Sequence, residues 1–411
     1  MKKFRKRIFV TAGFNTLYFG PGRKEFDPEK PMPTFEHYLQ EATQGTLAQI
    51  PNPDFDEGVI GNFMAGRFIK QGNLPGFLPH FVPALRERPC VGVEGACGSG
   101  GLALATAVKT VLAEVAESVF VLGFEIQNTL KALYGADVLA GAGYFRGERK
   151  KGHAYFFPGI FSERAGQYYE KYGYNLARQA MAHWYELAIL NARKYPKAQE
   201  YHNTAADLYH LGMTPPNPEK FVPHLNLYDC SKVSDGASSL VILSEAGREK
   251  LGVKKENCIE IIGLAQCEAD ITEPPREDTV LSTTQRAVER VLAQCGLAVH
   301  DIGLLELHDC FSITGLLALE SIGVAPPGKS AQFILDGQTQ PDGKLPVNPS
   351  GGLIGFGHPT GATGVRQMVD LWEQFTLRAA QTVKIKNPYG MMISMGGNDK
   401  TVTALIVKPV V

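Results

Sequence analysis

Short apolar runs alternate with segments of helical periodicity in this chain, and the alternation starts a second time after residue 258. In the first part the predicted strands are residues 8–14, 58–63, 90–94, 118–123 and 237–243, and the predicted helices are 34–48 and 102–115. In the second part the predicted strands are 259–264, 304–308, 391–394 and 402–407, and the predicted helices are 284–294, a segment from 313, and 362–377. This alternation predicts a mostly parallel α/β sheet with helices on both faces.

The sequence also indicates two related halves. Asp235 precedes the closing apolar run GASSLVILS, and Asp399 precedes the similar run KTVTALIVK. Between residues 125 and about 221 the alternation breaks, in a stretch rich in tyrosine and rich in proline toward its end. We therefore predict an N-terminal half (1–250) with an inserted lobe (about 125–221), and a C-terminal half (251–411).

Charge and hydropathy exclude several classes of protein. Lysine and arginine total 41 against 42 acidic residues, so no electrostatic case for nucleic acid exists. No apolar run reaches the roughly 18 residues of a membrane span, and the basic N-terminus is followed by an apolar patch that ends at Asn15 without a cleavage site. We expect neither nucleic acid nor membrane as a partner, and the C-terminus shows no targeting signal.

The seven cysteines indicate a reduced, cytoplasmic protein. Their number is odd, their spacing is irregular, and no C-x-x-C pair occurs. A disulfide framework and a zinc ribbon are therefore disfavoured, and we expect no bound metal but one or two reactive thiols.

The strongest local feature is a cysteine in the glycine-rich turn EGACGSGG, residues 94–101. Cys97 lies between a predicted strand and a predicted helix, where small neighbours let the backbone turn sharply and a substrate approach. A helix N-terminus stabilises a thiolate, so we expect Cys97 to be an acidic nucleophile. The alternative is a buried structural cysteine packed among glycines.

A second segment, ELHDCF at residues 306–311, places a histidine two residues before another thiol. In an extended segment such residues share a face, so His308 and Cys310 should point the same way. The pair suits proton transfer and contact with an oxyanion. A zinc site is disfavoured because no further ligand pair is clustered with them, and an incidental His-x-Cys is the remaining alternative.

Two glycine-rich segments lie near the C-terminus. Residues 348–364, NPSGGLIGFGHPTGATG, hold His358 between a glycine and a proline, as expected for a pre-positioned base or for a histidine that closes a tight loop. The segment does not fit a dinucleotide fingerprint, because it lies near the C-terminus, lacks the preceding strand in good register, and shows no acid about 20 residues further on in a βαβ unit. Residues 394–398, SMGGN, form a glycine turn whose N–H groups suit half of an oxyanion hole.

In this order the four segments resemble the thiolase superfamily, and within it the sterol-carrier-protein-type thiolases. The sequences EGACGSGG, HDCF and NPSGGLIGFGHPTGATG carry the resemblance, which extends over nearly the whole chain. It implies an α/β thiolase fold, with two pseudo-duplicated βαβαβαββ halves in a five-layered α-β-α-β-α arrangement and an inserted loop lobe. It also implies an acyltransferase that uses coenzyme A as a substrate and holds no tightly bound cofactor.

The resemblance assigns roles to the candidate residues. Cys97 would accept an acyl group from a CoA thioester, and His358 would take its proton and then help hold the thioester oxygen. His308 replaces the asparagine of many thiolases and would serve the first oxyanion hole. The N–H groups of Cys97 and Gly396 would form the second hole.

The position of the second thiol decides the subtype. Many thiolases carry it in a C-terminal Cys-x-Gly-Gly-Gly motif, where this chain has Ser394, and Cys310 resembles its substitute as acid and base. The sequence thus predicts thiolysis of a 3-oxoacyl-CoA, or the reverse Claisen condensation, through acyl-Cys97. The alternatives are a 3-oxoacyl synthase-type condensing enzyme, which typically uses one cysteine, and a catalytically silent thiolase-like scaffold subunit.

The inserted lobe bears on the substrate. Arg146, Arg149 and Lys150 lie where family members bind the nucleotide end of CoA, although a solvated charged loop explains them equally well. The stretch from Tyr134 to Tyr174 holds 11 of the 37 tyrosines and phenylalanines. Packing or a dimer contact accounts for them. The alternative is a pocket for an aryl substrate, as in the thiolases that cleave benzoylsuccinyl-CoA.

The resemblance finally implies assembly. Thiolases are typically dimers or tetramers, so we expect a homodimer or a higher homo-oligomer. Many bacterial and archaeal relatives of this branch also pair with a small OB-fold protein that bears a zinc ribbon, which makes such a protein the second expected partner.

Overall fold

Nine strands form one mixed sheet in the computed structural model, which describes residues 3–410. Their order across the sheet is β3-β2-β4-β5-β1-β6-β9-β8-β7. The strands are β1 (Ile8–Asn15), β2 (Glu57–Gly61), β3 (Cys90–Val93), β4 (Ser118–Glu125), β5 (Gly236–Leu243), β6 (Cys258–Glu268), β7 (Ile302–Glu306), β8 (Tyr389–Gly396) and β9 (Thr401–Pro409). Each strand expected from the sequence is present, but the expectation of a mostly parallel sheet was wrong, because five of the eight strand pairings are antiparallel.

The predicted helices are also present, and the structure adds others between them. The helices are α1 (Phe35–Leu47), α2 (Ala65–Phe68), α3 (Leu78–Phe81), α4 (Ser99–Leu112), α5 (Ala132–Leu139), α6 (Phe145–Glu148), α7 (Phe156–Tyr172), α8 (Tyr174–Ala192), α9 (Leu208–Gly212), α10 (Glu245–Lys250), α11 (Ser282–Cys295), α12 (Ser312–Ser321), α13 (Ser330–Leu335), α14 (Gly352–Gly355) and α15 (Thr363–Phe375). Among residues 3–410, none of them is both long and apolar enough to cross a membrane.

The sheet has two wings, one formed by β1 to β5 and the other by β6 to β9, and the two wings repeat one topology. Each opening strand, β1 or β6, pairs antiparallel with the closing strand of its own wing, β5 or β9. The opening strands also pair antiparallel with each other, which joins the wings. The counterpart of β3 in the second wing is a single parallel bridge between Leu305 and Val347. The expected βαβαβαββ pattern is therefore complete in the first wing and one full strand short in the second.

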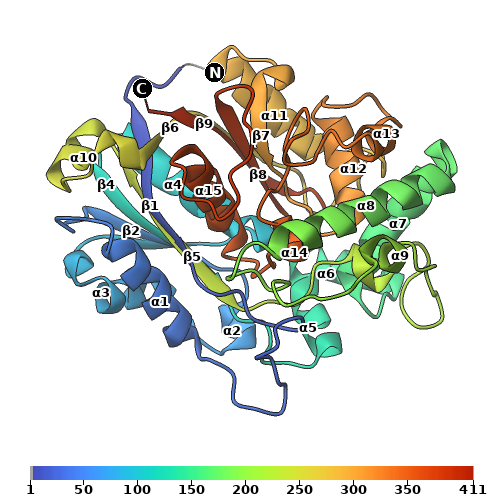
Figure 1. Ribbon diagram of the computed structural model, residues 1–411. Helices are drawn as coiled ribbons and strands as arrows, with labels where there is room; N and C mark the ends of the chain where they lie inside the picture. Colours follow the sequence, from blue (N-terminus) through green and yellow to red (C-terminus); the bar gives the residue numbers. More distant parts are fainter. Residues whose placement is uncertain (1–2, 411) are drawn as a thin grey trace.

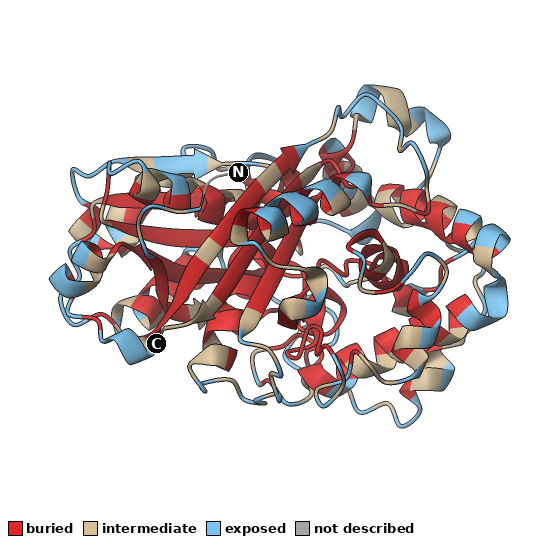
Figure 2. Cartoon of the chain, turned by 90° about the horizontal axis from the view of Figure 1, so that it is seen from above, coloured by how far each residue is buried: buried red, intermediate tan, exposed pale blue. Residues whose placement is uncertain are grey.

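Strands in both wings are buried on both faces, and alternate residues reach different cores. On β4, Val121 packs in the middle core while Leu122 packs in an outer one. On β9, Leu405 packs in the middle core while Ile406 packs in the other outer core. This period of two is the geometry of a strand covered on both sides, and Figure 2 shows the resulting buried centre.

Five layers follow from these contacts. Helices α4 and α15 lie side by side in the middle, where they pack on strands of both wings. Helix α1 covers the outer face of the first wing, and α11 covers that of the second (Figure 1). The arrangement is α-β-α-β-α, as expected, with the two wings of one continuous sheet as its β layers.

Helices α5 to α9 lie between β4 and β5 in the chain, and their longest members pack on the other wing. Helices α7 and α8 contact α12, and α8 also contacts α13 (Figure 1). The ring of Phe161 on α7 stacks on Phe311 with 4.6 Å between centroids. Many aromatic side chains of this segment are thus buried in the hydrophobic core, in the same cluster as residues of α12.

Candidate active site

The site forms where α4 and α15 begin, because glycines let the two helix starts touch. A Cβ on Gly100 would lie 2.7 Å from the amide N of Gly364, and one on Gly364 would lie 2.2 Å from the amide N of Gly101. Any side chain there would push the helices apart. This contact holds the cysteine turn against the loop that carries His358.

Cys97 lies in a single 3-10 turn between β3 and α4. Ala96 before it has φ 55°, a left-handed conformation that is strained for alanine. The turn is held locally: the Glu94 carboxylate accepts the N–H of Ala96 at 2.6 Å. The Ser99 hydroxyl accepts the N–H of Gly95 and donates to the Ala96 carbonyl. The expected strand-turn-helix placement of the cysteine is present.

The thiol of Cys97 is not acidic, contrary to our expectation. Its pKa is raised to about 12, chiefly by desolvation, and the nearby Glu125 carboxylate contributes to this rise. The N–H of Gly397 and its own N–H act in the opposite direction, but their effect is smaller than that of burial. The resting thiol is therefore protonated, so a nucleophilic role requires a base.

His358 is suited to be that base. Its Nδ1 lies 2.7 Å from the hydroxyl of Thr363, which itself donates to the Pro359 carbonyl. The hydroxyl can then only accept from the ring, which places the ring proton on Nδ1 and leaves a lone pair on Nε2. Burial, aided by the positive charge of Arg366, lowers the pKa of His358 to about 3. The ring is therefore neutral near pH 7.

His308 has the opposite tautomer. The N–H of Met395 donates to its Nδ1 at 3.3 Å, so the ring proton lies on Nε2, which makes Nε2 a donor. The rings of His308 and His358 meet edge to face, with 5.1 Å between centroids. Burial lowers the pKa of His308 well below its usual value, and His358 and Arg366 add to the effect. One histidine can thus accept a proton while the other donates a hydrogen bond.

Cys310 lies close enough to Cys97 for the two thiols to interact electrostatically. Burial raises its pKa well above the usual value, and Cys97 is the next largest cause. Its Sγ lies 3.9 Å from the Thr314 hydroxyl. The geometric reason differs from the expected one: β7 ends at Glu306, so His308 and Cys310 share a loop before α12 rather than one face of a strand.

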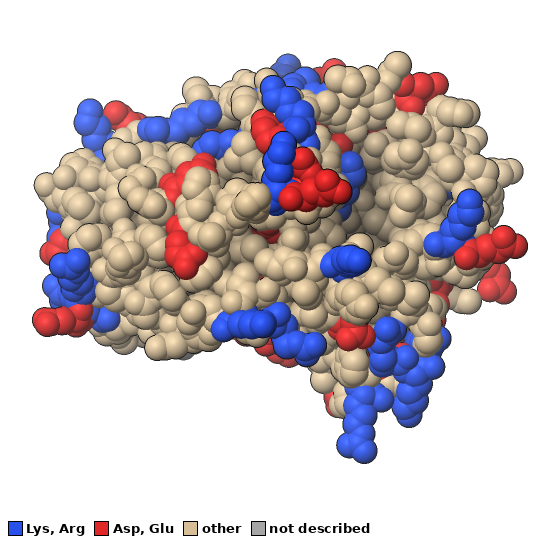
Figure 3. Space-filling model, turned by 90° about the horizontal axis from the view of Figure 1, so that it is seen from below, with Lys and Arg blue, Asp and Glu red and all other residues tan. Residues whose placement is uncertain are grey.

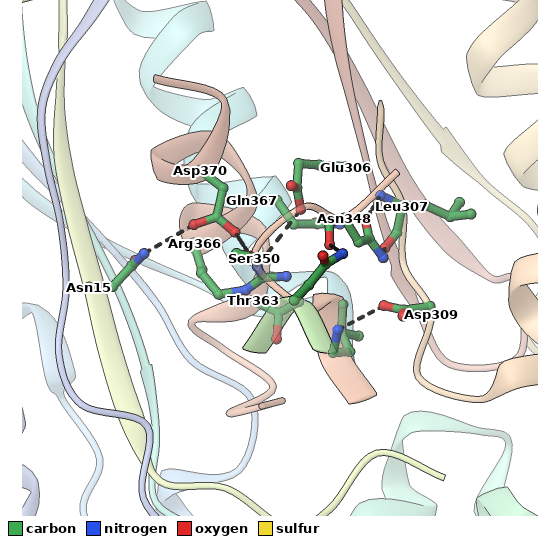
Figure 4. A network of polar contacts seen from close by, with 12 residues as sticks. Asn15, Glu306, Leu307, Asp309, Asn348, Ser350, Thr363, Arg366, Gln367 and Asp370 are labelled. Atoms are coloured by element: carbon green, nitrogen blue, oxygen red, sulfur yellow. Dashed lines mark hydrogen bonds and ion pairs between the residues drawn. The ribbon is translucent and has the colours of Figure 1, made fainter. Parts of the chain in front are cut away.

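Two polar side chains fix this loop from either side (Figure 4). Asn348 accepts the N–H of Leu307 at 2.7 Å and donates to the carbonyl of the same residue at 3.0 Å. Asp309 accepts the N–H of Leu353 at 2.7 Å and the indole N–H of Trp184 at 3.0 Å. The loop is therefore tied to α14 and to α8, which restricts the positions of its two functional side chains.

A buried ion cluster joins the end of β7 to helix α15 (Figure 4). The Arg366 guanidinium pairs with Asp370, donates to Ser350 at 3.0 Å, and lies 3.8 Å from Glu306. Burial raises the pKa of Glu306 well above its usual range, and Asp370 adds to the rise. Arg366 thus helps keep both histidines neutral.

Gly396 and Ser394 lie on β8 beside the cysteine turn. A Cβ on Gly98 would lie 3.1 Å from the amide N of Gly396, so this amide faces the turn. The N–H that hydrogen-bonds the thiol itself belongs to Gly397, which our sequence analysis did not single out. Ser394 is buried against Gly101, and its hydroxyl has no hydrogen-bond partner among residues 3–410.

The predicted CoA contacts lie in the lobe. Arg146 belongs to α6, and Arg149 and Lys150 belong to the 3-10 turn after it. Arg149 is already engaged, because it pairs with Asp137 at 3.2 Å and donates to the carbonyl of His153. Figure 3 shows lysine and arginine side chains gathered on a part that projects from the body. A role of these residues in CoA binding stays a prediction.

A half-buried thiol at a helix start, together with a buried thiol and two neutral histidines in a five-layered α/β fold, is typical of enzymes that transfer acyl groups through cysteine. The family model described as thiolase C-terminal domain-like matches residues 268–408. The acetyl-CoA acetyltransferase of Methanocaldococcus jannaschii is 31% identical over 86% of this chain and 88% of its own length. The chain belongs to the thiolase family, and it is an acyltransferase.

Other relatives and solved structures agree on the fold. Benzoylsuccinyl-CoA thiolase subunit BbsB of Thauera aromatica is 28% identical over 89% of this chain and 88% of its own. The solved Ltp2-ChsH2(DUF35) aldolase superposes with a TM-score of 0.78 at 20% identity, over 98% of both chains. Human mitochondrial 3-ketoacyl-CoA thiolase in complex with CoA gives 0.70 at 17% identity, over 99% of both.

Proposed function

We propose that this protein cleaves a 3-oxoacyl-CoA by thiolysis, or runs the reverse Claisen condensation, through an acyl-Cys97 intermediate. One observation carries the proposal: two histidines of opposite tautomer meet edge to face, and Cys310, two residues from one of them, interacts electrostatically with Cys97. Carbon–carbon cleavage needs a nucleophile, a base for it, an oxyanion donor and a separate acid, and the site supplies one group for each.

In the first half-reaction, the Cys97 proton moves to Nε2 of His358 as sulfur attacks the 3-oxo carbon. The developing oxyanion takes a hydrogen bond from Cys97 N–H and from a glycine N–H at 396 or 397. The bond between C2 and C3 then breaks, and its electron pair forms the enolate of an acyl-CoA. Nε2–H of His308 stabilises the enolate oxygen while Cys310 protonates C2.

In the second half-reaction, the thiol of coenzyme A gives its proton to the Cys310 thiolate and attacks the acyl carbon of acyl-Cys97. The Cys97 thiolate leaves and recovers its proton from His358. Both thiols are then protonated again, in agreement with the raised pKa of each.

Thiolysis of 3-oxoacyl-CoAs by the purified protein, with Cys97→Ala as control, tests the proposal. Consumption of CoA with formation of two acyl-CoA products supports it. Condensation without detectable thiolysis favours a synthase, and failure to form any acyl-enzyme from acyl-CoA favours a silent scaffold subunit. A screen over short-chain, long-chain and aryl substrates, benzoylsuccinyl-CoA included, then assigns the acyl group.

The lobe cations supply a separate test of CoA binding. Arg146 and Lys150 are proposed to contact the CoA phosphates. The double variant Arg146→Ala/Lys150→Ala should raise the KM for CoA several-fold and leave kcat nearly unchanged. Lys70→Ala with Arg88→Ala, outside the lobe, is the matched control. An unchanged KM in the lobe variant rejects the assignment.

We further propose that the working enzyme is at least a homodimer and that it associates with a small OB-fold, zinc-ribbon protein. Support comes from two proteins similar to this chain, one described as a subunit and one solved as a complex with a DUF35 protein. Light scattering should give at least twice the chain mass of 44.8 kDa. A fully active monomer contradicts both expectations.

A further inference from the structure

Glu125 is a buried carboxylate for which the proposed chemistry has no use. We propose that Glu125 is a positioning residue that holds the loop after β2 and the His358 loop in register with Cys97. The inference deepens the proposed function and rests on it only for the effect on turnover.

Glu125 ends β4, is fully buried, and accepts hydrogen bonds from two loops. From the loop after β2, it accepts the N–H of Phe63 at 2.9 Å, the N–H of Met64 at 3.1 Å and the side-chain amide of Asn62 at 3.2 Å. From the loop before α15, it accepts the Thr360 hydroxyl at 2.9 Å. One carboxylate therefore joins segments about 300 residues apart in the chain.

The first loop reaches the nucleophile. Phe63 packs in a small cluster with Ala96, the residue before Cys97, and with Ala142. The fixed place of Phe63 therefore supports the left-handed turn at Ala96. If that loop shifted, the sulfur would move relative to His358.

The second loop carries the base. Thr360 lies two residues after His358 and three before Thr363, which orients the imidazole. Gly361 fits so closely that a Cβ there would lie 2.3 Å from the Phe124 carbonyl and 2.8 Å from Cα of Asn62. The two loops therefore touch at the point where Glu125 bonds both of them.

The charge state of the Glu125 carboxylate, which clamps the two loops together, matters as well. The contacts of Glu125 are neutral donors from the two loops, and the titratable group that faces it is Cys97. Burial raises the pKa of Glu125 to about 7. Only the ionised carboxylate accepts on both oxygens, so it clamps the loops fully, but its charge also disfavours the Cys97 thiolate.

Alkylation of Cys97 by iodoacetamide between pH 5 and 9, read by peptide mass, tests the inference without any thiolase assay. In the wild type, the rate should rise less than tenfold per pH unit between about 6 and 8, because ionisation of Glu125 opposes thiolate formation. In Glu125→Gln the rate should rise tenfold per unit throughout and exceed the wild-type rate at pH 8 by roughly three- to tenfold.

Turnover by Glu125→Gln should fall, although its alkylation rate at pH 8 should rise. Glu125→Gln should lower kcat by about 10- to 100-fold with KM within about twofold, since a displaced base slows chemistry more than binding. The control is Glu57→Gln, a buried carboxylate at the far end of β2, which should change neither readout. If Glu125→Gln does not fold, Thr360→Val keeps the charge and loses one clamp bond, and should lower kcat while keeping the wild-type alkylation profile.

Two results would overturn the inference. One is an alkylation profile in Glu125→Gln that matches the wild type at unchanged kcat. The other is a loss of turnover in Glu57→Gln as large as that in Glu125→Gln. If the wild type shows no thiolysis, the proposed function fails, and the alkylation profile still decides the role of Glu125.

Discussion

At the scale of single residues, Thr363 decides which nitrogen of His358 carries the ring proton and which one is free to act as the proposed base. Its hydroxyl is committed to the Pro359 carbonyl and can only accept from the ring. Thr363→Val keeps the shape but removes that acceptor, so the ring loses its fixed tautomer. We expect kcat to fall by about 10- to 100-fold with little change in KM.

Steady-state kinetics of Thr363→Ser provide the control, because serine retains the hydroxyl and should recover most of the turnover. Equal losses in the valine and serine variants would mean that packing, rather than the hydrogen bond, is what matters at this position.

The proposed nucleophile and its proposed partners could be singled out from the sequence because each has a local signature. A cysteine in a glycine turn and a histidine between glycine and proline are visible in short windows of sequence. Glu125 and Gly397 were missed because their roles depend on contacts over long sequence separations, such as the 235 residues between Glu125 and Thr360. Thr363 was missed although its partner His358 is only five residues away, because the sequence does not show that its hydroxyl points at the ring. One signal was available for Glu125: an acid directly follows the buried run SVFVLGF.

The acidity of Cys97 was the clearest error at this scale. A helix N-terminus favours a thiolate, but its effect is modest compared with the desolvation of this thiol. Sequence shows the helix start and does not show how deeply the turn lies in the molecule. The raised pKa then makes His358 more important, because the thiol cannot ionise unaided.

At the scale of elements, helix α4 must pass very close to β8. A Cβ on Gly101 would lie 2.6 Å from Cβ of Ser394 and 3.1 Å from Cβ of Thr403. Gly101→Ala should therefore destabilise the protein by about 1–3 kcal/mol and lower activity, since it displaces the strand that ends at Gly396.

Chemical denaturation of Gly101→Ala beside Gly66→Ala measures this effect. Gly66 also lies in a helix, α2, but a Cβ there would have nothing within 4 Å. Its variant should be neutral or slightly more stable. A Gly101→Ala protein as stable as Gly66→Ala would show that α4 and β8 can separate without cost.

Strands were predictable because burial on both faces makes them continuous apolar runs. The end of β7 was misplaced by two residues: Leu307 continues the apolar run, but it and His308 already belong to the loop fixed by Asn348. The single bridge at Val347 gave no strand pattern in the sequence. Such features depend on tertiary hydrogen bonds rather than on local periodicity.

At the scale of the whole molecule, all seven cysteines have a raised pKa, with burial as the largest cause. The residues are Cys90, Cys97, Cys230, Cys258, Cys267, Cys295 and Cys310. Unfolded thiols lose their protons near pH 8.5, whereas the folded ones keep them. The folded state then binds more protons, so the free energy of unfolding should fall as pH rises from 7.5 to 9.5, with each strongly buried thiol contributing about 1.4 kcal/mol per unit above pH 8.5.

Urea unfolding under reducing conditions at several pH values checks this prediction. Cys258→Ala is the informative variant, because this thiol lies outside the site and its pKa is raised to about 11. Above pH 8.5, the free energy of unfolding of this variant should fall less steeply with pH than that of the wild type. The difference in slope should be about 1.4 kcal/mol per pH unit, which corresponds to one bound proton. A free energy of unfolding that stays level or increases over this range would contradict the assignment of buried, protonated thiols.

The division of labour between the two thiols is the central claim, and acyl transfer in Cys310→Ala tests it most directly. The variant should still form acyl-Cys97 from a radiolabelled acyl-CoA, because the nucleophile and His358 are intact. Its thiolysis rate should fall by about a hundred- to ten-thousandfold, the usual contribution of a positioned acid and base. Cys97→Ala should lose both steps. If Cys310→Ala keeps thiolysis near the wild-type rate, the acid lies elsewhere and the account of the two thiols is wrong.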